Sequence, residues 1–271
     1  MNDTPHADTA MLLRSNHAGG VTVLTLNRPA RRNSLSLAML QALHTALDAI
    51  ATDTTVRAVV LAANGPVFCA GHDLAEITAH RADADHGQGF FTQAMATCAG
   101  VMQAIVALPQ PVVAAVQGVA TAAGCQLVAT CDLAVASSAA KFCTPGVDIG
   151  LFCSTPAVAL ARAVPRKAAM EMLLLGNMIG AEEAHRIGLV NRVVTPGTEI
   201  DVALELATAI ARRSALTIRL GKAGFYRQLG QDLASAYADT AAVMVENLLA
   251  EDAAEGIGAF LAKRAPVWRD R

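Results

Sequence analysis

Short apolar runs alternate with helix-forming segments through the first two-thirds of this chain, and only helix-forming segments follow. The apolar runs have the length and the β-branched content of strands buried in a parallel sheet. Strands are predicted at residues 21–26, 56–62, 112–116, 132–136 and 141–143. This order predicts an α/β fold with a helical C-terminal region.

The spacing of large aliphatic residues predicts the helices. Leu40, Leu43 and Leu47 fall on one face of a helix over residues 36–51. Further helices are predicted at 91–107, 122–130, 155–164, 166–175, 181–187, 200–212, 214–228, 231–250 and 252–262. The last four follow one another without an intervening strand, which is why the C-terminal region is expected to be all-helical.

The composition indicates subunit interfaces. Apolar residues make up 54% of the 271 residues and charged residues only 16%. The segment 112–131 is the most apolar, but glutamine and glycine residues interrupt it, so we expect no membrane span. The surplus apolar surface predicts a homo-oligomer. We expect residues 1–16 to form a flexible leader, 17–200 the core, and 201–271 a helical oligomerisation region.

Charge and cysteine usage limit the other classes of function. The net charge is −2 with no basic stripe and few aromatic residues, which disfavours a nucleic-acid partner. The six cysteines form no CxxC pair and lie mostly in apolar runs, so we expect reduced thiols and a cytoplasmic protein. No apolar signal core is visible near the N-terminus. The histidines have no metal-ligand spacing, and no metal is expected.

Four segments together resemble one known family. They read LNRPARRNSLS at 26–36, FCAGHDLAE at 68–76, PVVAAVQGVATAAGCQLVATCDLAVAS at 111–137 and MEMLLLGNMIGAEEAHRIGLVNRVV at 170–194. Over about 15–268 the chain is similar to the enoyl-CoA hydratase/isomerase (crotonase) family. The resemblance implies a repeated β-β-α spiral, assembly as a trimer or a dimer of trimers, and an acyl-CoA thioester as substrate. It implies no separate cofactor, because coenzyme A enters as part of the substrate.

The resemblance also implies an oxyanion hole. The backbone N–H groups of His72 and Ala123 would hold the thioester oxygen and stabilise an enolate-like intermediate. Fixed amide dipoles at the start of a helix suit this task, because they need no reorganisation when charge develops. The alternative is that Ala122-Ala123-Gly124 only packs a helix against a sheet. The imidazole of His72 has two further options, to donate a hydrogen bond or to act as a base.

Further residues are assigned to the coenzyme A moiety by the same resemblance. Ala70 and Leu74 would contact the adenine and pantetheine groups through their backbone, and Asp73 would shape the channel. Arg31 lies in the loop where relatives place a base near the phosphates, and plain surface charge is its alternative role. Lys263 is a further phosphate candidate, including for a site on a neighbouring subunit.

Two positions depart from the pattern of a hydratase, which uses two glutamates to add water. The first would fall at Gln126, whose amide can orient water but cannot exchange a proton at neutral pH. The second would fall at Gly146, which has no side chain. If the segment is strand-like, Asp148 shares the face of Gly146 and offers a single base; a capping or ion-pairing role is its alternative. Cys153 is expected to be a core cysteine rather than a nucleophile.

These departures leave several functions open. An acyl-CoA-processing enzyme of this family is the first hypothesis, with isomerisation, decarboxylation or slow hydration as its reaction. A catalytically silent acyl-CoA-binding protein is the second. Efficient hydration is disfavoured under both hypotheses.

Overall fold

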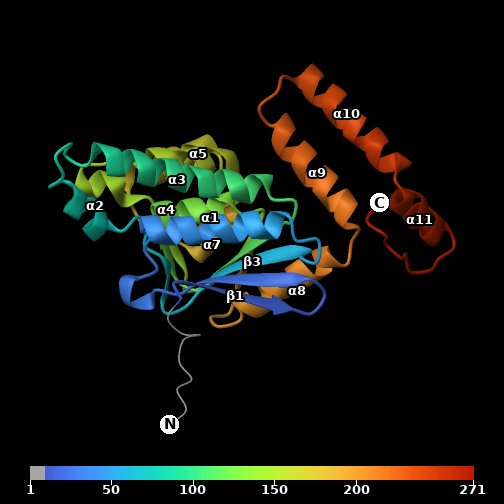
Figure 1. The fold of residues 1–271 in the computed structure, drawn as a ribbon, viewed down its shortest axis with the longest axis horizontal. Helices are drawn as coiled ribbons and strands as arrows, with labels where there is room; N and C mark the ends of the chain where they lie inside the picture. Colours follow the sequence, from blue (N-terminus) through green and yellow to red (C-terminus); the bar gives the residue numbers. More distant parts are fainter. Residues whose placement is uncertain (1–9) are drawn as a thin grey trace, which may run out of the picture.

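The computed structural model describes residues 10–271 and contains two β-sheets surrounded by helices (Figure 1). The larger sheet has the strand order β1-β2-β3-β5-β7-β10 and the smaller one β4-β6-β8-β9. The larger sheet comprises β1 (Leu12–His17), β2 (Val21–Leu26), β3 (Ala58–Ala63), β5 (Val112–Val116), β7 (Leu133–Ser137) and β10 (Arg192–Val194). The smaller sheet comprises β4 (Val67–Cys69), β6 (Val119–Thr121), β8 (Lys141–Cys143) and β9 (Ile179–Gly180).

From β3 to β8, successive strands alternate between the two sheets. The strands β3, β5 and β7 pair in parallel in the larger sheet, and the strand after each of them, β4, β6 and β8, pairs in parallel in the smaller sheet. One or more helices follow each pair of strands. This arrangement is a β-β-α spiral, and it confirms both the α/β class and the spiral that the sequence resemblance implies.

Eleven α-helices and two short 3-10 helices are found among the described residues. They are α1 (Leu37–Ala51), α2 (Leu74–His80), α3 (Gln88–Ala107), α4 (Ala123–Thr130), α5 (Ser154–Ala163), α6 (Arg166–Leu175), α7 (Ala181–Arg186), α8 (Glu199–Ala211), α9 (Ala215–Gln228), α10 (Leu233–Leu249), α11 (Glu251–Leu261), η1 (Pro29–Arg31) and η2 (Pro145–Ile149). Helix α1 shows why they form: Ser36 caps its first turn by accepting from the amide of Met39, and Leu40, Leu43 and Leu47 are buried.

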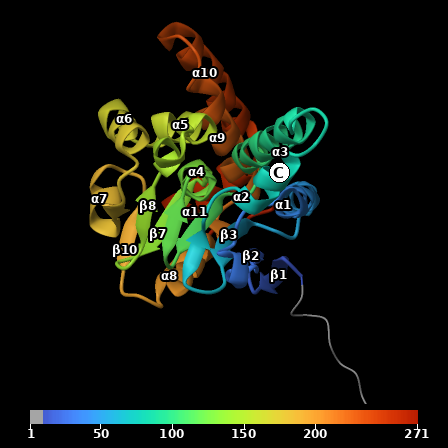
Figure 2. The same cartoon turned by 90° about the vertical axis from the view of Figure 1, so that its left-hand side faces the viewer.

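Helices cover both faces of the larger sheet (Figures 1 and 2). One face packs with α1, α3 and α4 into the main apolar core. The other face is covered by α8, whose Ala203, Ala207 and Ala211 pack against Val60 and Val113. The small residues let the helix lie close to the sheet. Helix α8 therefore belongs to the core, and the predicted boundary at residues 200/201 is too early; the helical extension begins after it.

The extension α9–α11 projects away from the sheets (Figure 1). Helix α9 is held by its Lys222, whose Nζ lies 2.7 Å from Asp132 Oδ2 and donates to the carbonyl of Ile105 at the end of α3. The Tyr226 hydroxyl donates to the other carboxylate oxygen of Asp132 at 2.9 Å. This buried group ties α9 to the turn between α4 and β7.

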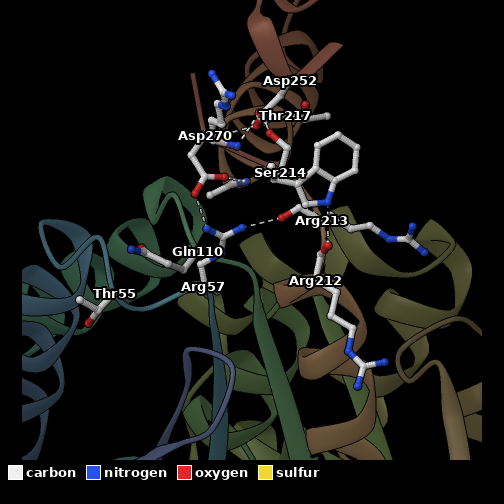
Figure 3. Close-up of polar contacts among 12 residues, drawn as sticks. Thr55, Arg57, Gln110, Arg212, Arg213, Ser214, Thr217, Asp252 and Asp270 are labelled. Atoms are coloured by element: carbon white, nitrogen blue, oxygen red, sulfur yellow. Dashed lines mark hydrogen bonds and ion pairs between the residues drawn. The ribbon is translucent and has the colours of Figure 1, made fainter. Parts of the chain in front are cut away.

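The C-terminal tail folds back onto the start of the extension (Figure 3). The carboxylate of Asp252 accepts from the amides of Arg269 and Asp270 at 2.7 and 2.9 Å. The carboxylate of Asp270 in turn accepts from the Ala215 amide at 2.7 Å and pairs with the guanidinium of Arg57 in the core. The tail thus fixes the junction between α8 and α9.

One prediction for the N-terminus is wrong where the structure describes it. Residues 12–16 were expected in a flexible leader, but Leu12–His17 forms β1, antiparallel to β2 from Leu12 opposite Leu26 to His17 opposite Val21. Most of β1 is exposed at the sheet edge, and its polar residues conceal the alternation that marks a half-buried strand. Residues 1–9 lie outside the described part of the chain.

Helix α3 has the length and apolar composition of a membrane-spanning helix. Its residues Ala94, Cys98, Val101, Met102 and Ile105 are buried in the main core, where α3 packs against α1. Core helices of globular proteins can have the same length and apolar composition, so α3 gives no support to a membrane-bound protein.

Candidate functional site

Two backbone segments meet at the predicted oxyanion hole. Gly71 has a φ of 82°, and a Cβ added there would lie 2.9 Å from the Ala122 Cβ and 3.3 Å from the Ala123 nitrogen. Only glycine fits this approach and this backbone conformation. The segment after β4 is therefore pressed against the start of α4, and the two predicted amides lie on adjoining segments.

The amide N–H of His72 points away from the segment that contains Leu35. Leu35 and His72 form a parallel bridge, in which the Leu35 amide donates to the Gly71 carbonyl at 2.8 Å and the Asp73 amide donates to the Leu35 carbonyl at 3.3 Å. In such a bridge the central residue, here His72, points its own N–H and C=O to the opposite side. The His72 N–H is thus left for another acceptor.

The amide of Ala123 is the first of helix α4. Ala122 precedes it with φ 49° and ψ −117°, a conformation that alanine rarely adopts. It is held there by its amide, which donates to the Cys143 carbonyl at 2.9 Å, and by its carbonyl, which accepts from the Gln126 amide at 3.0 Å. The first N–H of a helix has no intrahelical partner and lies at the positive end of the helix dipole. Backbone strain of this kind is typical of functional sites.

The packing explanation of the same run holds for Gly124. A Cβ there would lie 2.2 Å from the Cys69 carbonyl oxygen, so the glycine lets α4 pack against β4. The two interpretations of Ala122-Ala123-Gly124 are therefore compatible. The glycine brings the helix close to β4, and Ala123 presents the amide.

Two side chains at this site carry buried polar atoms without partners. Gln126 is 4% exposed and its Oε1 has no hydrogen-bond partner among the described residues. The Nε2 of His72 is also buried and unpartnered within residues 10–271. Burial lowers the pKa of His72 below 6.5, and a hydrogen bond to the backbone of Leu35 opposes part of this shift.

The position of the second predicted glutamate has no room for a side chain. A Cβ on Gly146 would lie 2.8 Å from the Leu151 carbonyl oxygen and 2.9 Å from the Cys153 Sγ. Asp148 is exposed, and the segment is the 3-10 helix η2 rather than a strand. The expectation that Asp148 shares the face of Gly146 is therefore wrong, because about three residues make a turn here. Its role as a base stays a prediction.

The thiols around the site are protonated. Cys69, Cys125, Cys143 and Cys153 are buried and free. Burial raises the pKa of Cys69 to about 12, and it raises the pKa values of Cys125, Cys143 and Cys153 as well. A protonated thiol is a poor nucleophile, which agrees with the prediction that Cys153 is a core residue.

The predicted coenzyme A residues differ in what they contact. Asp73 caps α2 by accepting from the amides of Ala75 and Glu76, and it accepts from the Ser34 hydroxyl at 3.1 Å. Arg28 lies 3.9 Å from Asp73 and donates to Ser36 at 2.9 Å. Sequence reasoning missed Arg28 and Ser34, since neither stands out in the motif.

Arg31 lies exposed in η1, and Leu74 is 50% exposed at the start of α2. The Ala70 amide donates to the Arg32 carbonyl at 3.0 Å, so only the Ala70 carbonyl is left for a ligand. Lys263 follows α11, at the opposite end of the molecule from α2 (Figure 1). A phosphate role for Lys263 is consequently confined to the site of another subunit.

No group of three or more His, Cys, Asp or Glu side chains arranged to hold a metal ion is found in residues 10–271.

Comparison with known proteins identifies relatives over almost the whole chain. A sequence model described as enoyl-CoA hydratase/isomerase matches residues 16–271. The chain is 49% identical over 249 residues to the enoyl-CoA hydratase domain-containing protein 3, mitochondrial, of Rattus norvegicus, covering 92% of this chain and 81% of the relative. A crystal structure of an enoyl-CoA hydratase from Mycobacterium smegmatis superposes with a TM-score of 0.91 at 50% identity, covering 96% and 99% of the two chains. The human domain-containing protein 3 gives a TM-score of 0.89 at 46% identity, covering 96% and 100%.

These relatives contradict one prediction. The rat, human, mouse and Xenopus laevis relatives are all named as mitochondrial proteins, whereas the sequence predicted a cytoplasmic one. The prediction rested on reduced cysteines and on the lack of an export signal. Neither feature separates the cytoplasm from the interior of an organelle that also keeps thiols reduced.

Proposed function

The chain belongs to the enoyl-CoA hydratase/isomerase family, and we propose on this premise that it binds an acyl-CoA thioester and stabilises the enolate form of its acyl group. The observation that carries the proposal is the contact between Gly71-His72 and Ala122-Ala123, which places on adjoining segments two amide N–H groups that the bridge to Leu35 and the start of α4 leave unpaired. The thioester oxygen would accept from both.

The two amides would stabilise the negative charge that develops on the thioester oxygen, rather than complement the shape of the substrate. When the bond to the α-substituent breaks, the electron pair moves towards the thioester oxygen. Amides held by the segment after β4 and by the start of α4 would meet that charge without reorganising, and such stabilisation is the largest single contribution in many acyl-transferring sites. One such donor is worth about 10²–10³ in rate where it has been removed from other enzymes.

The side chains at the site favour reactions other than hydration. Gln126 cannot take a proton, and Gly146 has no space for a glutamate. Isomerisation needs only one proton carrier, such as Asp148 or a water molecule on Gln126. Decarboxylation needs no base, because the carboxylate leaves as CO₂ and the electron pair of the broken C–C bond stays in the enolate, whose α-carbon then takes a proton from water. A silent acyl-CoA-binding protein is the alternative that the same two residues favour.

The acyl-CoA would lie between the loop that contains η1 and the start of α2. Arg31 is the proposed phosphate contact, Ala70 and Leu74 would meet the adenine and pantetheine through their backbone, and Asp73 would hold the shape of the channel through its cap of α2. Exposure of Arg31 and Leu74 supports this arrangement. No cofactor is proposed beyond the coenzyme A of the substrate.

We further infer that the protein is a homotrimer or a dimer of trimers. Helix α10 buries none of its residues within the chain, and Leu233 and Tyr237 are 75% and 69% exposed. They line a mainly apolar groove of about 540 Å³ between α9 and α10. Apolar surface of this extent supports contact with other copies.

The test combines binding with turnover. Titration calorimetry should show that butyryl-CoA binds, and a crotonyl-CoA hydration assay should show little or no turnover. Binding without hydration supports an isomerase, a decarboxylase or a silent binder. Rapid hydration would refute the expectation drawn from Gln126 and Gly146, and a lack of binding would refute the proposed function.

A further inference from the structure

The direction of the His72 N–H is set by a hydrogen bond to its own peptide group. The carbonyl of Gly71 and the N–H of His72 belong to one trans peptide, so they point in opposite directions. The Gly71 carbonyl accepts from the Leu35 amide at 2.8 Å. The Leu35 amide therefore fixes the direction in which the His72 N–H points. The residues that hold Leu35 in place hold the proposed oxyanion donor as well.

Leu35 lies in a loop that backbone hydrogen bonds connect to the segment on either side of His72. On one side the Ala70 amide donates to the Arg32 carbonyl at 3.0 Å. On the other side the Asp73 amide donates to the Leu35 carbonyl at 3.3 Å, which is long for a backbone hydrogen bond. The backbone alone thus holds the loop less firmly on the side of Asp73.

Side chains add contacts on this weaker side. The Asp73 carboxylate caps α2 and also accepts from the Ser34 hydroxyl at 3.1 Å. The Glu76 carboxylate, in the first turn of α2, accepts from the amide of Leu37, the first residue of α1, at 3.0 Å. Two acidic side chains of α2 therefore bind the chain just before and at the start of α1.

Arg28 joins these contacts to the rest of the loop. Its guanidinium donates to the hydroxyl of Ser36, the cap of α1, at 2.9 Å and lies 3.9 Å from the Asp73 carboxylate. Its backbone N–H donates to Asn33 Oδ1 at 2.8 Å, and its carbonyl accepts from the Asn33 amide at 3.0 Å. Arg28 thus contacts a residue before Leu35, the residue after it, and the acid that follows the donor.

The burial of this ion pair makes its charge matter. The side chains of Arg28 and Asp73 are 26% and 14% exposed. A carboxylate that is largely withdrawn from water needs a cation or several donors to stay charged. The guanidinium of Arg28 is engaged by Ser36 and Asp73, whereas Arg31 in the same loop is exposed. The two arginines are therefore suited to different tasks.

We propose that Arg28 is a positioning residue for the oxyanion hole. It holds the Leu35 amide in place through Asp73 and Ser36. That amide in turn keeps the His72 N–H directed at the thioester oxygen. The inference rests on the proposed function, which supplies the thioester, and it gives Arg28 no contact with the substrate. Loss of the Arg28 side chain should therefore weaken the contact to the carbonyl and leave the binding of the rest of the ligand unchanged.

The test compares butyryl-CoA with S-butyl-CoA, the thioether that lacks only the carbonyl oxygen. In calorimetric titrations, the ratio of the two Kd values reports the contact to that oxygen. Arg28→Met keeps an unbranched side chain but removes its charge and its donors. It should reduce the preference for the thioester by about 2- to 12-fold, the effect of one hydrogen bond. The Kd for the thioether should stay within about threefold of the wild type.

A matched variant and a second readout separate positioning from general destabilisation. Arg14 on the edge strand β1 also pairs with an aspartate, Asp53 at 3.0 Å, and Arg14→Met should leave the preference unchanged. Arg28→Lys keeps the charge and should retain part of the preference. Hydrogen exchange of the Leu35 amide requires no ligand. It should become about fivefold faster or more in Arg28→Met and stay unchanged in Arg14→Met.

The outcomes distinguish the inference from the proposed function. A wild type that binds neither ligand, or both equally, refutes the proposed function and the inference with it. If the wild type prefers the thioester, an unchanged preference or unchanged Leu35 exchange in Arg28→Met overturns the inference alone. An equal loss of preference in Arg14→Met does the same. If Arg28→Met does not fold, the same two measurements on Arg28→Lys decide.

Discussion

At the scale of single residues, Gly146 shows how the structure changes the interpretation of a missing side chain. From the sequence it is a lost glutamate that mutagenesis is expected to restore. In the structure the Leu151 carbonyl and the Cys153 thiol occupy the space where a side chain would begin. A glutamate at this position therefore requires the backbone of residues 146–153 to move.

Gly146→Ala should destabilise the protein for the same reason. Overpacking of a well-filled site costs about 1–3 kcal/mol. For a domain of this size each kcal/mol lowers Tm by roughly 2–4 °C, which differential scanning calorimetry resolves. Gly180→Ala is the control, since a Cβ there has no neighbour within 4 Å. Equal Tm values for the two variants would show that the site at Gly146 is not closed.

The buried imidazole of His72 predicts a pH dependence of stability. Its pKa is lowered in the folded state, so the unfolded chain binds the proton first as the pH falls below 6.5. The free energy of unfolding should therefore decrease below pH 6.5 and be unaffected by this group above pH 7.5. Urea unfolding between pH 5 and 8 should show a smaller decrease for His72→Gln. The charged neighbours Asp73, Glu76 and Arg28 are common to both proteins, so parallel curves would contradict the buried neutral ring.

The sequence predicted this site unevenly. His72 and Ala123 could be proposed as site residues because the AGHD and AAGCQ motifs resemble the family pattern. The closure at Gly146 could not be predicted, because it depends on Cys153, which returns to the site through the turn after η2. The face of Asp148 was misjudged because a 3-10 helix was read as extended chain.

At the scale of elements, α9 is attached to the core by one buried ion pair. The Lys222 side chain is 7% exposed and that of Asp132 is 16% exposed. Lys222 also donates to the carbonyls of Ile105 and Gln110 at 3.0 and 3.2 Å, so it satisfies groups that the end of α3 leaves open. The Lys222 ammonium thus donates both to the carbonyl of Ile105 at the end of α3 and to the carboxylate of Asp132 in the turn before β7.

Lys222→Met should consequently cost more than the loss of one hydrogen bond. It leaves the Asp132 carboxylate buried without its counter-charge, and breaking a buried pair in this way costs about 3–5 kcal/mol. Tyr226→Phe removes only a hydrogen bond to the same carboxylate and should cost about 1.5–3 kcal/mol. Urea denaturation measures both. If Lys222→Met costs no more than Tyr226→Phe, the Lys222–Asp132 ion pair does not attach α9 to the core.

Element boundaries were predicted well where a helix is buried on one face or a strand is buried along its whole length. The predicted helix over 166–175 agrees with α6, and the strand over 112–116 agrees with β5. The three-residue strands β4 and β6 are too short for a periodic pattern and were missed, whereas β8, which is equally short, was predicted. Helix α8 was found but was assigned to the wrong part, since its alanine-rich face does not reveal whether it packs on a sheet or on another subunit.

At the scale of the whole molecule, the projecting extension predicts self-association. Tyr237→Asp places a charge in the apolar groove between α9 and α10 and should shift the protein towards monomer. Size-exclusion chromatography with light scattering measures this. Gln41→Asp on the exposed side of α1 carries the same charge change and should keep the wild-type mass. An unchanged mass in Tyr237→Asp would exclude this groove as the contact between copies.

The account depends most on the two amides as ligands of a thioester carbonyl. The direct measurement is calorimetric titration with butyryl-CoA and with the matching S-butyl-CoA thioether, which lacks only the carbonyl oxygen. Two hydrogen bonds of about 0.5–1.5 kcal/mol each predict that the thioester binds about 5- to 150-fold more tightly. Equal affinities for the thioester and the thioether would contradict an oxyanion hole at His72 and Ala123.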